Sequence, residues 1–81
     1  MAKKSPIHAG SQTLVLLGTE VRKARAIRGL SQEGLAVDAL LDRSYLSGIE
    51  LGKHNLTLMN LVKLATALGV RPSELLERSG L

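Results

Sequence analysis

Apolar residues recur along the chain with a helical period in five separate stretches. In the first stretch they are three or four positions apart, and charged residues fall between them. The pattern predicts a helix that begins at Ser11 or Thr13 and is stopped by Gly29, because a glycine after a basic last turn favours a helix end. The apolar stripe of this helix is Leu14, Leu17, Val21, Ala24 and Ile27.

Two short helices are predicted next. Ser31 is a suitable N-cap for a helix over residues 32–39, and Asp42 is one for a helix over residues 43–51. Only residues 40–41 separate them, and two short helices joined so tightly must cross steeply, as in a helix-turn-helix. The residues expected to face inward are Leu35, Ala36, Ala39, Leu46 and Ile49.

Two further helices complete the chain. Thr57 caps a fourth, which Gly69 ends, and Pro72 opens a fifth that ends near Gly80. The stripe of the fourth is Leu58, Leu61, Leu64, Ala65 and Leu68. Since no stretch alternates as a strand does, the predicted fold is all-α: a compact five-helix bundle over residues 13–81, preceded by a flexible basic arm over residues 1–12.

Composition narrows the picture. The chain has 81 residues, 44% of them apolar, with no cysteine and Tyr45 as its one aromatic residue. A domain this small is marginal with a single core and has no disulfide to help it, so oligomerisation is expected. The net charge of +4 suits a polyanionic partner. The scarcity of aromatic residues argues against single-stranded nucleic acid, whose bases stack on exposed rings.

The sequence has no signal for a membrane protein, a metal-binding protein or an enzyme. No apolar run is long enough for a signal peptide or a membrane span, so a cytoplasmic protein without a membrane partner is expected. His8 and His54 are the only histidines, and with no cysteine they predict no metal site. No nucleophile motif or phosphate loop frames the serines, so neither an enzyme nor a cofactor is predicted.

Three segments together resemble the Cro/CI-type (XRE-like) helix-turn-helix transcription regulators: Gly29–Glu33, Asp42–Lys53 and Leu64–Val70. The resemblance spans about residues 17–76 and implies a lambda-repressor-like bundle that binds double-stranded DNA as a homodimer. The stretch Asp42–Glu50 is also similar to the controller proteins of restriction–modification systems, which are small dimeric regulators without a ligand domain. No small-molecule ligand is therefore expected.

The resemblance places the helix over residues 43–51 in the major groove, where each base pair has a distinct donor and acceptor pattern. Arg43 carries a planar fork that fits guanine, although a phosphate contact or a solvated arginine is the alternative. Ser44 and Ser47 have hydroxyls that reach a base or a phosphate, or are simply exposed. Tyr45 either belongs to the core or faces the DNA, where its hydroxyl would donate a hydrogen bond to a phosphate.

The same resemblance implies phosphate contacts on both sides of that helix. Gln32 stands at a helix start, where backbone N–H groups and the helix dipole favour an anion. Lys53, His54 and Asn55 form the loop that lies along the DNA backbone in the family, and all three carry donors.

Arg25 and Glu50 match positions that form an ion pair between the first and third helices of the family. Three residues depart from its pattern, and one of them is Gly34, which replaces the usual helix former. The family commonly has glycine where Leu40 stands, so we expect strain there or a turn of different construction. Gly48 stands where a longer side chain often reaches a base, which reduces the set of reading residues.

One binding alternative remains, an antitoxin-like module that binds a partner protein and for which DNA binding is secondary. It would need a toxin-binding segment, and little of the chain lies outside the five helices. For the homodimer, the candidate interface residues on or near the last two helices are Leu56, Met59, Val70 and Leu76, each of which is otherwise a core residue.

Overall fold

The computed structural model describes residues 11–81 and contains five helices, as predicted. No strand occurs among these residues. The predicted basic arm lies largely outside the described part of the chain, since only its last two residues fall within it. The helices are α1 (Gln12–Arg28), α2 (Gln32–Ala39), α3 (Arg43–Glu50), α4 (Leu58–Leu68) and α5 (Pro72–Arg78).

The helix ends follow the predicted caps closely. The hydroxyls of Ser11, Ser31 and Thr57 each accept a hydrogen bond from the backbone N–H three residues later, so each satisfies a donor that the helix leaves free. Gly29 and Gly69 end α1 and α4 in the left-handed conformation, at φ 72° and 75°. Within the described residues, α1 and its cap Ser11 therefore lie partly inside the predicted arm.

The predicted ends of the third and fifth helices are off by one or two residues. The third helix ends at Glu50 rather than at Leu51, which is its C-cap, and the fifth ends at Arg78. At the start of α5, the Glu74 carboxylate accepts a hydrogen bond from the backbone N–H of Arg71, 2.8 Å long. That bond favours the ionised carboxylate and lowers the pKa of Glu74 from its ordinary value.

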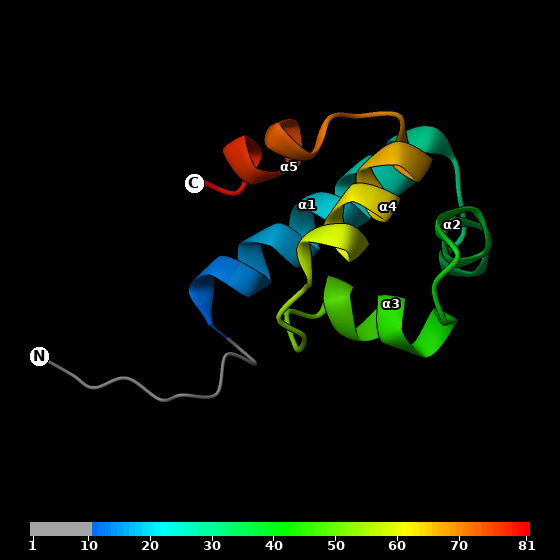
Figure 1. The fold of residues 1–81 in the computed structure, drawn as a ribbon, viewed down its shortest axis with the longest axis horizontal. Helices are drawn as coiled ribbons and strands as arrows, with labels where there is room; N and C mark the ends of the chain where they lie inside the picture. Colours follow the sequence, from blue (N-terminus) through cyan, green and yellow to red (C-terminus); the bar gives the residue numbers. More distant parts are fainter. Residues whose placement is uncertain (1–10) are drawn as a thin grey trace, which may run out of the picture.

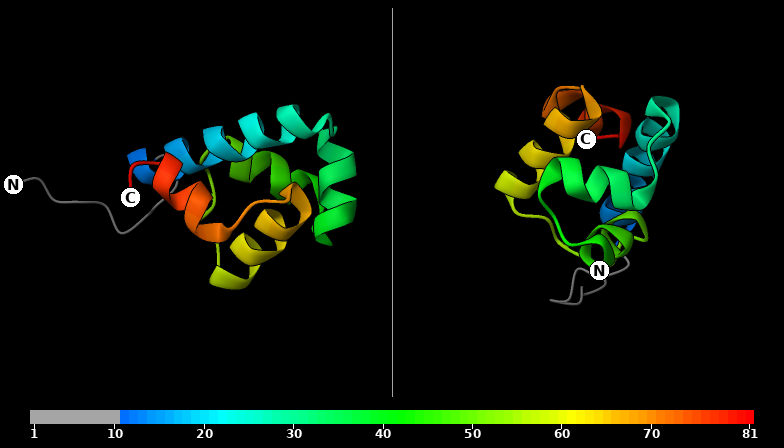
Figure 2. Two further views of the ribbon diagram at one scale, coloured as in Figure 1. Left: turned by 90° about the horizontal axis from the view of Figure 1, so that it is seen from above. Right: turned by 90° about the vertical axis from the view of Figure 1, so that its right-hand side faces the viewer.

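The helices surround one aliphatic core. α1 is the long spine and packs against α3, α4 and α5, while α2 packs against α3 and α4 (Figure 1). Seen from above, α1 runs along one side of the molecule with α5 and α4 opposite (Figure 2). The fully buried side chains at the centre are Val21, Leu35, Leu46, Leu64 and Leu75.

Two residues predicted for the apolar stripes are instead exposed. Ile27 is 83% exposed because it lies about 120° around α1 from Val21, so the helical period carries it off the buried face. Leu58 is 72% exposed; it is the first residue of α4 and precedes the first buried position, Leu61. Both leave large apolar surface in water.

The tight turn between α2 and α3 is built on Leu40 in the left-handed conformation, at φ 59° and ψ 44°. The suggestion that this turn has a different construction is therefore wrong. The leucine takes the conformation that a glycine would adopt more easily, at a cost of about 1–2 kcal/mol. Its side chain is 80% exposed, so packing offsets little of that strain.

Candidate nucleic-acid interface

α3 presents one face to the core and the other to solvent. Leu46, Ile49 and Glu50 are buried, whereas Arg43 and Ser44 in the first turn are exposed. The helix lies along one edge of the molecule, next to α2, with α4 and α5 away from that edge (Figure 1). α3 is therefore placed to present its polar side chains to a partner.

Two glycines let α1 and α3 approach backbone to backbone. A methyl group on Gly18 would collide with the carbonyl oxygen of Ile49 and would come 2.8 Å from that of Glu50. Gly52, just after α3, lies against the backbone of Val15 and has φ 77°. The position of α3 is thus fixed by main-chain contact at both residues.

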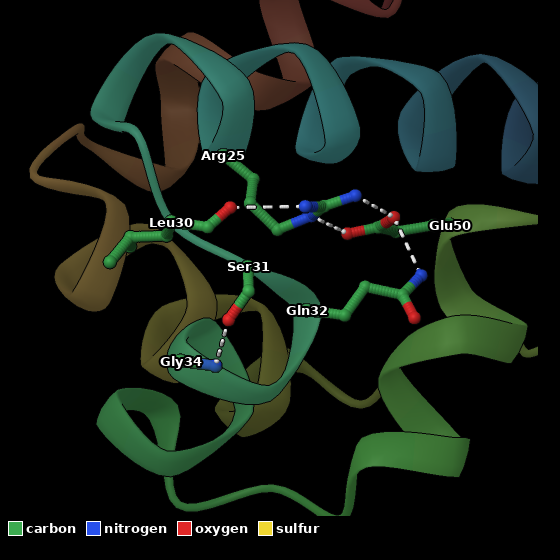
Figure 3. Close-up of polar contacts among 6 residues, drawn as sticks. All are labelled: Arg25, Leu30, Ser31, Gln32, Gly34 and Glu50. Carbon is green, nitrogen blue, oxygen red and sulfur yellow. Dashed lines mark hydrogen bonds and ion pairs between the residues drawn. The ribbon is translucent and has the colours of Figure 1, made fainter.

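An ion pair holds α3 to α1 as the resemblance implied. The guanidinium of Arg25 donates to both carboxylate oxygens of Glu50, at 2.7 Å and 3.0 Å, and also to the carbonyl of Leu30 at 3.0 Å (Figure 3). Because the carboxylate favours the charged guanidinium, these contacts raise the pKa of Arg25 from its already high value. Two parallel hydrogen bonds also fix the direction of the Glu50 carboxylate, and this orients the last turn of α3.

Gln32 takes part in the same network. Its side-chain amide donates to Glu50 at 3.0 Å, so this residue, at the first position of α2, also links α2 to α3 (Figure 3). The N-cap Ser31 beside it is exposed, and its hydroxyl accepts the N–H of Gly34. One amide hydrogen of Gln32 is therefore used within the protein.

At the start of α3 the capping prediction is partly wrong. Asp42 is the N-cap, but its carboxylate makes no hydrogen bond to the helix backbone. It accepts the hydroxyl of Ser44 instead, at 2.7 Å. Arg43 between them is exposed. Ser44 thus has a partner that fixes its hydroxyl in the free protein.

Tyr45 has the core position that was one of its two predicted roles, and its hydroxyl has a partner within the protein. It is half-buried and packs against the core, while its hydroxyl accepts a hydrogen bond from the side-chain amide of Asn60, at 3.1 Å. The ring of His54 stacks on it with a centroid distance of 4.8 Å. Gly48 lies beneath that histidine and is buried, so it is not an open position on the outer face.

The loop after α3 follows the same edge of the molecule. Its backbone is held to the helix because the N–H of Lys53 donates to the carbonyl of Gly48, at 2.9 Å. The side chains of Lys53 and Asn55 are exposed, and that of His54 is half-buried. The predicted site residues that the fold brings to α3 and its flanks are Gln32, Arg43, Ser44, Tyr45, Ser47, Lys53, His54 and Asn55.

The sequence interpretation missed three residues that shape this site: Gly18, Gly52 and Asn60. Gly18 lies inside a strong helical stripe, where a glycine costs about 1 kcal/mol against alanine, and that cost was a signal of close backbone approach. Asn60 carries no comparable signal, because a polar residue in the first turn of a helix is ordinary.

Two further features are absent from the described residues, a cluster of metal ligands and a membrane-spanning helix. Within residues 11–81 no three histidine, aspartate or glutamate side chains gather in a way that would hold a metal ion. Of the helices that the structure describes, none has the length and apolar character needed to cross a bilayer.

Comparison with known proteins identifies the fold. The helix-turn-helix family matches residues 21–75, which include all of α2 and α3. The control protein C.BamHI of Bacillus amyloliquefaciens is 44% identical over 64 residues, which are 78% of this chain and 79% of that protein. The chain belongs to the helix-turn-helix family, in its Cro/CI (XRE) branch, and is a DNA-binding transcription regulator.

Within this family the similarity is to control proteins in particular. The control protein C.MunI of a Mycoplasma species is also 44% identical, over 75% of this chain and 84% of that protein. The crystal structure of the restriction–modification controller protein C.AhdI from Aeromonas hydrophila is similar with a TM-score of 0.75 and 52% identity, and covers 76% of this chain and 94% of that one. These matches favour the regulator over the antitoxin-like alternative.

Proposed function

We propose that this protein binds a specific double-stranded DNA site as a homodimer, with α3 of each subunit in the major groove, and that it controls a restriction–modification operon. The first turn of α3 carries the proposal: Arg43 and Ser44 are exposed there, while Leu46, Ile49 and Glu50 further along the helix are buried. A helix fits the major groove, and base edges there are distinguishable by hydrogen bonding. Similarity to C.AhdI and to the control proteins supports the cellular role.

The contacts divide into base reading and phosphate binding. Arg43 reads guanine with its bidentate fork, and Ser44 and Ser47 contact bases or phosphates beside it. Gln32 at the start of α2 and the loop side chains of Lys53 and Asn55 bind phosphates on either side of the groove. Tyr45 and His54 lie at the edge of the same surface.

We propose that the homodimer forms through the exposed start of α4. Leu58 and Met59 are 72% and 63% exposed, and a pair of large apolar side chains in water favours a protein contact. The other three candidate residues, Leu56, Val70 and Leu76, are half-buried and pack against the core, so they contribute less. A dimer of this motif reaches two half-sites about 34–36 Å apart.

The same proposal makes the protein a regulator without catalytic activity. The side chains on α3 and its flanks are hydrogen-bonding groups suited to contact DNA. Its place of action is then the bacterial cytoplasm, where the DNA is.

Mobility-shift titration against the DNA upstream of its own gene tests the function. Binding should be cooperative and should weaken steeply with salt, because phosphate contacts release counterions. Arg43→Ala should abolish the preference for the specific site, whereas Lys53→Ala should weaken specific and random DNA alike. Lys23→Ala, which removes an exposed cation from α1, is the matched control and should leave the preference unchanged. Failure to bind this DNA and all genomic fragments at low salt would refute the proposal.

A further inference from the structure

The imidazole of His54 lies on α3, although the residue belongs to the loop that follows the helix. Its ring stacks on that of Tyr45, with centroids 4.8 Å apart and 29° between the ring planes. Its Nε2–Cδ2 edge faces the Cα of Gly48 so closely that a methyl group on the glycine would collide with it. The ring therefore fills the space that a side chain at position 48 would take.

That space adjoins the side of α3 on which Ser44, one of the proposed DNA contacts, is exposed. Ser44 and Gly48 are four positions apart, so they lie about 40° apart around the helix and one turn apart along it. Ser44 is exposed, and the His54 ring consequently stands one turn further along the same row. The ring atoms nearest to the glycine are Nε2 and Cδ2, so Nδ1 is not part of the edge seated on it.

The ring is held there from α4. The Asn60 amide donates to the hydroxyl of Tyr45 at 3.1 Å, which fixes the tyrosine ring on which the histidine stacks. The backbone bond from Lys53 to Gly48 anchors the loop from the other side. Asn60, Tyr45 and His54 thus form a chain of contacts that leads from α4 to the outer face of α3.

We propose that His54 is a specificity-determining residue that replaces the side chain missing at Gly48, and that Tyr45 and Asn60 are positioning residues that hold its ring. The proposal rests on the proposed DNA binding by α3 and replaces a phosphate contact of His54 with a base contact. An imidazole N–H is a donor, and guanine offers two acceptors on its major-groove edge. His54 therefore selects guanine at one position of each half-site.

Selection from DNA with a randomised half-site tests this assignment, using the full chain with His54→Phe and His54→Ala. Phenylalanine keeps a ring that can stack on Tyr45 and lacks both ring nitrogens. We expect a preference for guanine of about tenfold at one position in the wild type. In both variants that preference is lost, while the preferences at the other positions stay unchanged.

Three other results overturn the inference. If every preference of the wild type persists in both variants, His54 does not read a base. If affinity falls equally for specific and random DNA, His54 binds a phosphate. If the wild type itself selects no sequence, the proposed function fails together with the inference. The first two results leave sequence selection by the wild type intact, so they count against the inference alone.

The positioning residues have a separate test. Tyr45→Phe keeps the stacked ring and removes the acceptor, and Asn60→Ala removes the donor. Each should weaken the guanine preference at the same position by about two- to tenfold, the range expected for one hydrogen bond. The double variant should be no worse than either single one, because both remove the same bond. Thr66→Ala, exposed elsewhere on α4, is the control; weaker preferences at all positions, or none weakened, would contradict the positioning role.

A final pair of variants tests whether the His54 ring packs against Gly48. Gly48→Ala collides with the His54 ring, so it should reduce the guanine preference and lower the melting temperature. In the His54→Ala background the collision partner is gone, and Gly48→Ala should leave the melting temperature the same or higher. Equal effects of Gly48→Ala in both backgrounds would show that the ring does not occupy this place.

Discussion

Replacing Arg25 by methionine removes the guanidinium that neutralises a buried carboxylate. The side chain of Glu50 is only 2% exposed, and after the change its remaining partner is the neutral amide of Gln32. Breaking a buried pair by removal of one member costs about 3–5 kcal/mol, because a charge is left uncompensated in the interior. A domain of this length has about 4–12 kcal/mol of stability in total. The variant should therefore lose between a quarter and all of it.

Thermal unfolding followed by circular dichroism at pH 7 measures this loss. One kcal/mol corresponds to about 4–8 °C in a domain of this size, so Arg25→Met should lower Tm by at least about 12 °C. The double variant Arg25→Met with Glu50→Leu should recover at least half of the loss, because it removes the unpaired charge as well. Arg25→Lys keeps the charge but not the two parallel bonds, and its Tm should lie between those of the wild type and Arg25→Met.

The reasoning would be refuted by a fall in Tm of less than about 4 °C for Arg25→Met, which would mean that Glu50 is solvated without its partner. A double variant no more stable than Arg25→Met would contradict it as well, since the cost would then not be that of an unpaired charge.

Three further predictions follow from the helix ends and the helix contacts. Leu40→Gly should raise Tm, because relief of about 1–2 kcal/mol of left-handed strain exceeds the 0.5–1 kcal/mol that glycine costs in chain entropy; a lower Tm would show that Leu40 is unstrained. Gly18→Ala should cost about 1–3 kcal/mol in urea unfolding and weaken DNA binding, because the methyl group meets backbone that cannot yield; unchanged affinity would show that α3 tolerates the shift. The pKa of Glu74 is lowered by folding, so its contribution is present above the unfolded value of about 4.3 and is lost as pH falls through the folded value. Tm should thus fall less on acidification in Glu74→Gln than in the wild type, and parallel pH profiles would contradict the capping bond.

The local features of the fold were predictable because they depend on neighbouring residues. Ser31 and Thr57 cap helices as expected, since a hydroxyl before an apolar period satisfies an N–H group only three positions away. Ser11 does the same for the helix that was expected to begin at Ser11 or Thr13. The ion pair of Arg25 with Glu50 was predictable only from the family resemblance, because 25 residues separate its members.

Features that depend on close approach between distant segments were not predictable in this way. The exposure of Ile27 follows from the exact angular drift of a helix over several turns, which a count of threes and fours does not resolve. Gly48 was interpreted as an empty place on the reading helix, whereas a histidine from the following loop fills it. Which of the predicted DNA contacts form stays a prediction.

The backbone contact between α1 and α3 at Gly18 also bears on how such a regulator diverges. Docking of α3 depends on main-chain atoms and on its inner residues, and not on the side chains of Arg43 and Ser44, which are exposed. Substitutions at those two positions should therefore change stability by only about 0.5 kcal/mol. If these side chains read the DNA as proposed, related proteins can then change their target sequence without loss of stability. Recognition and folding would in that case evolve almost independently.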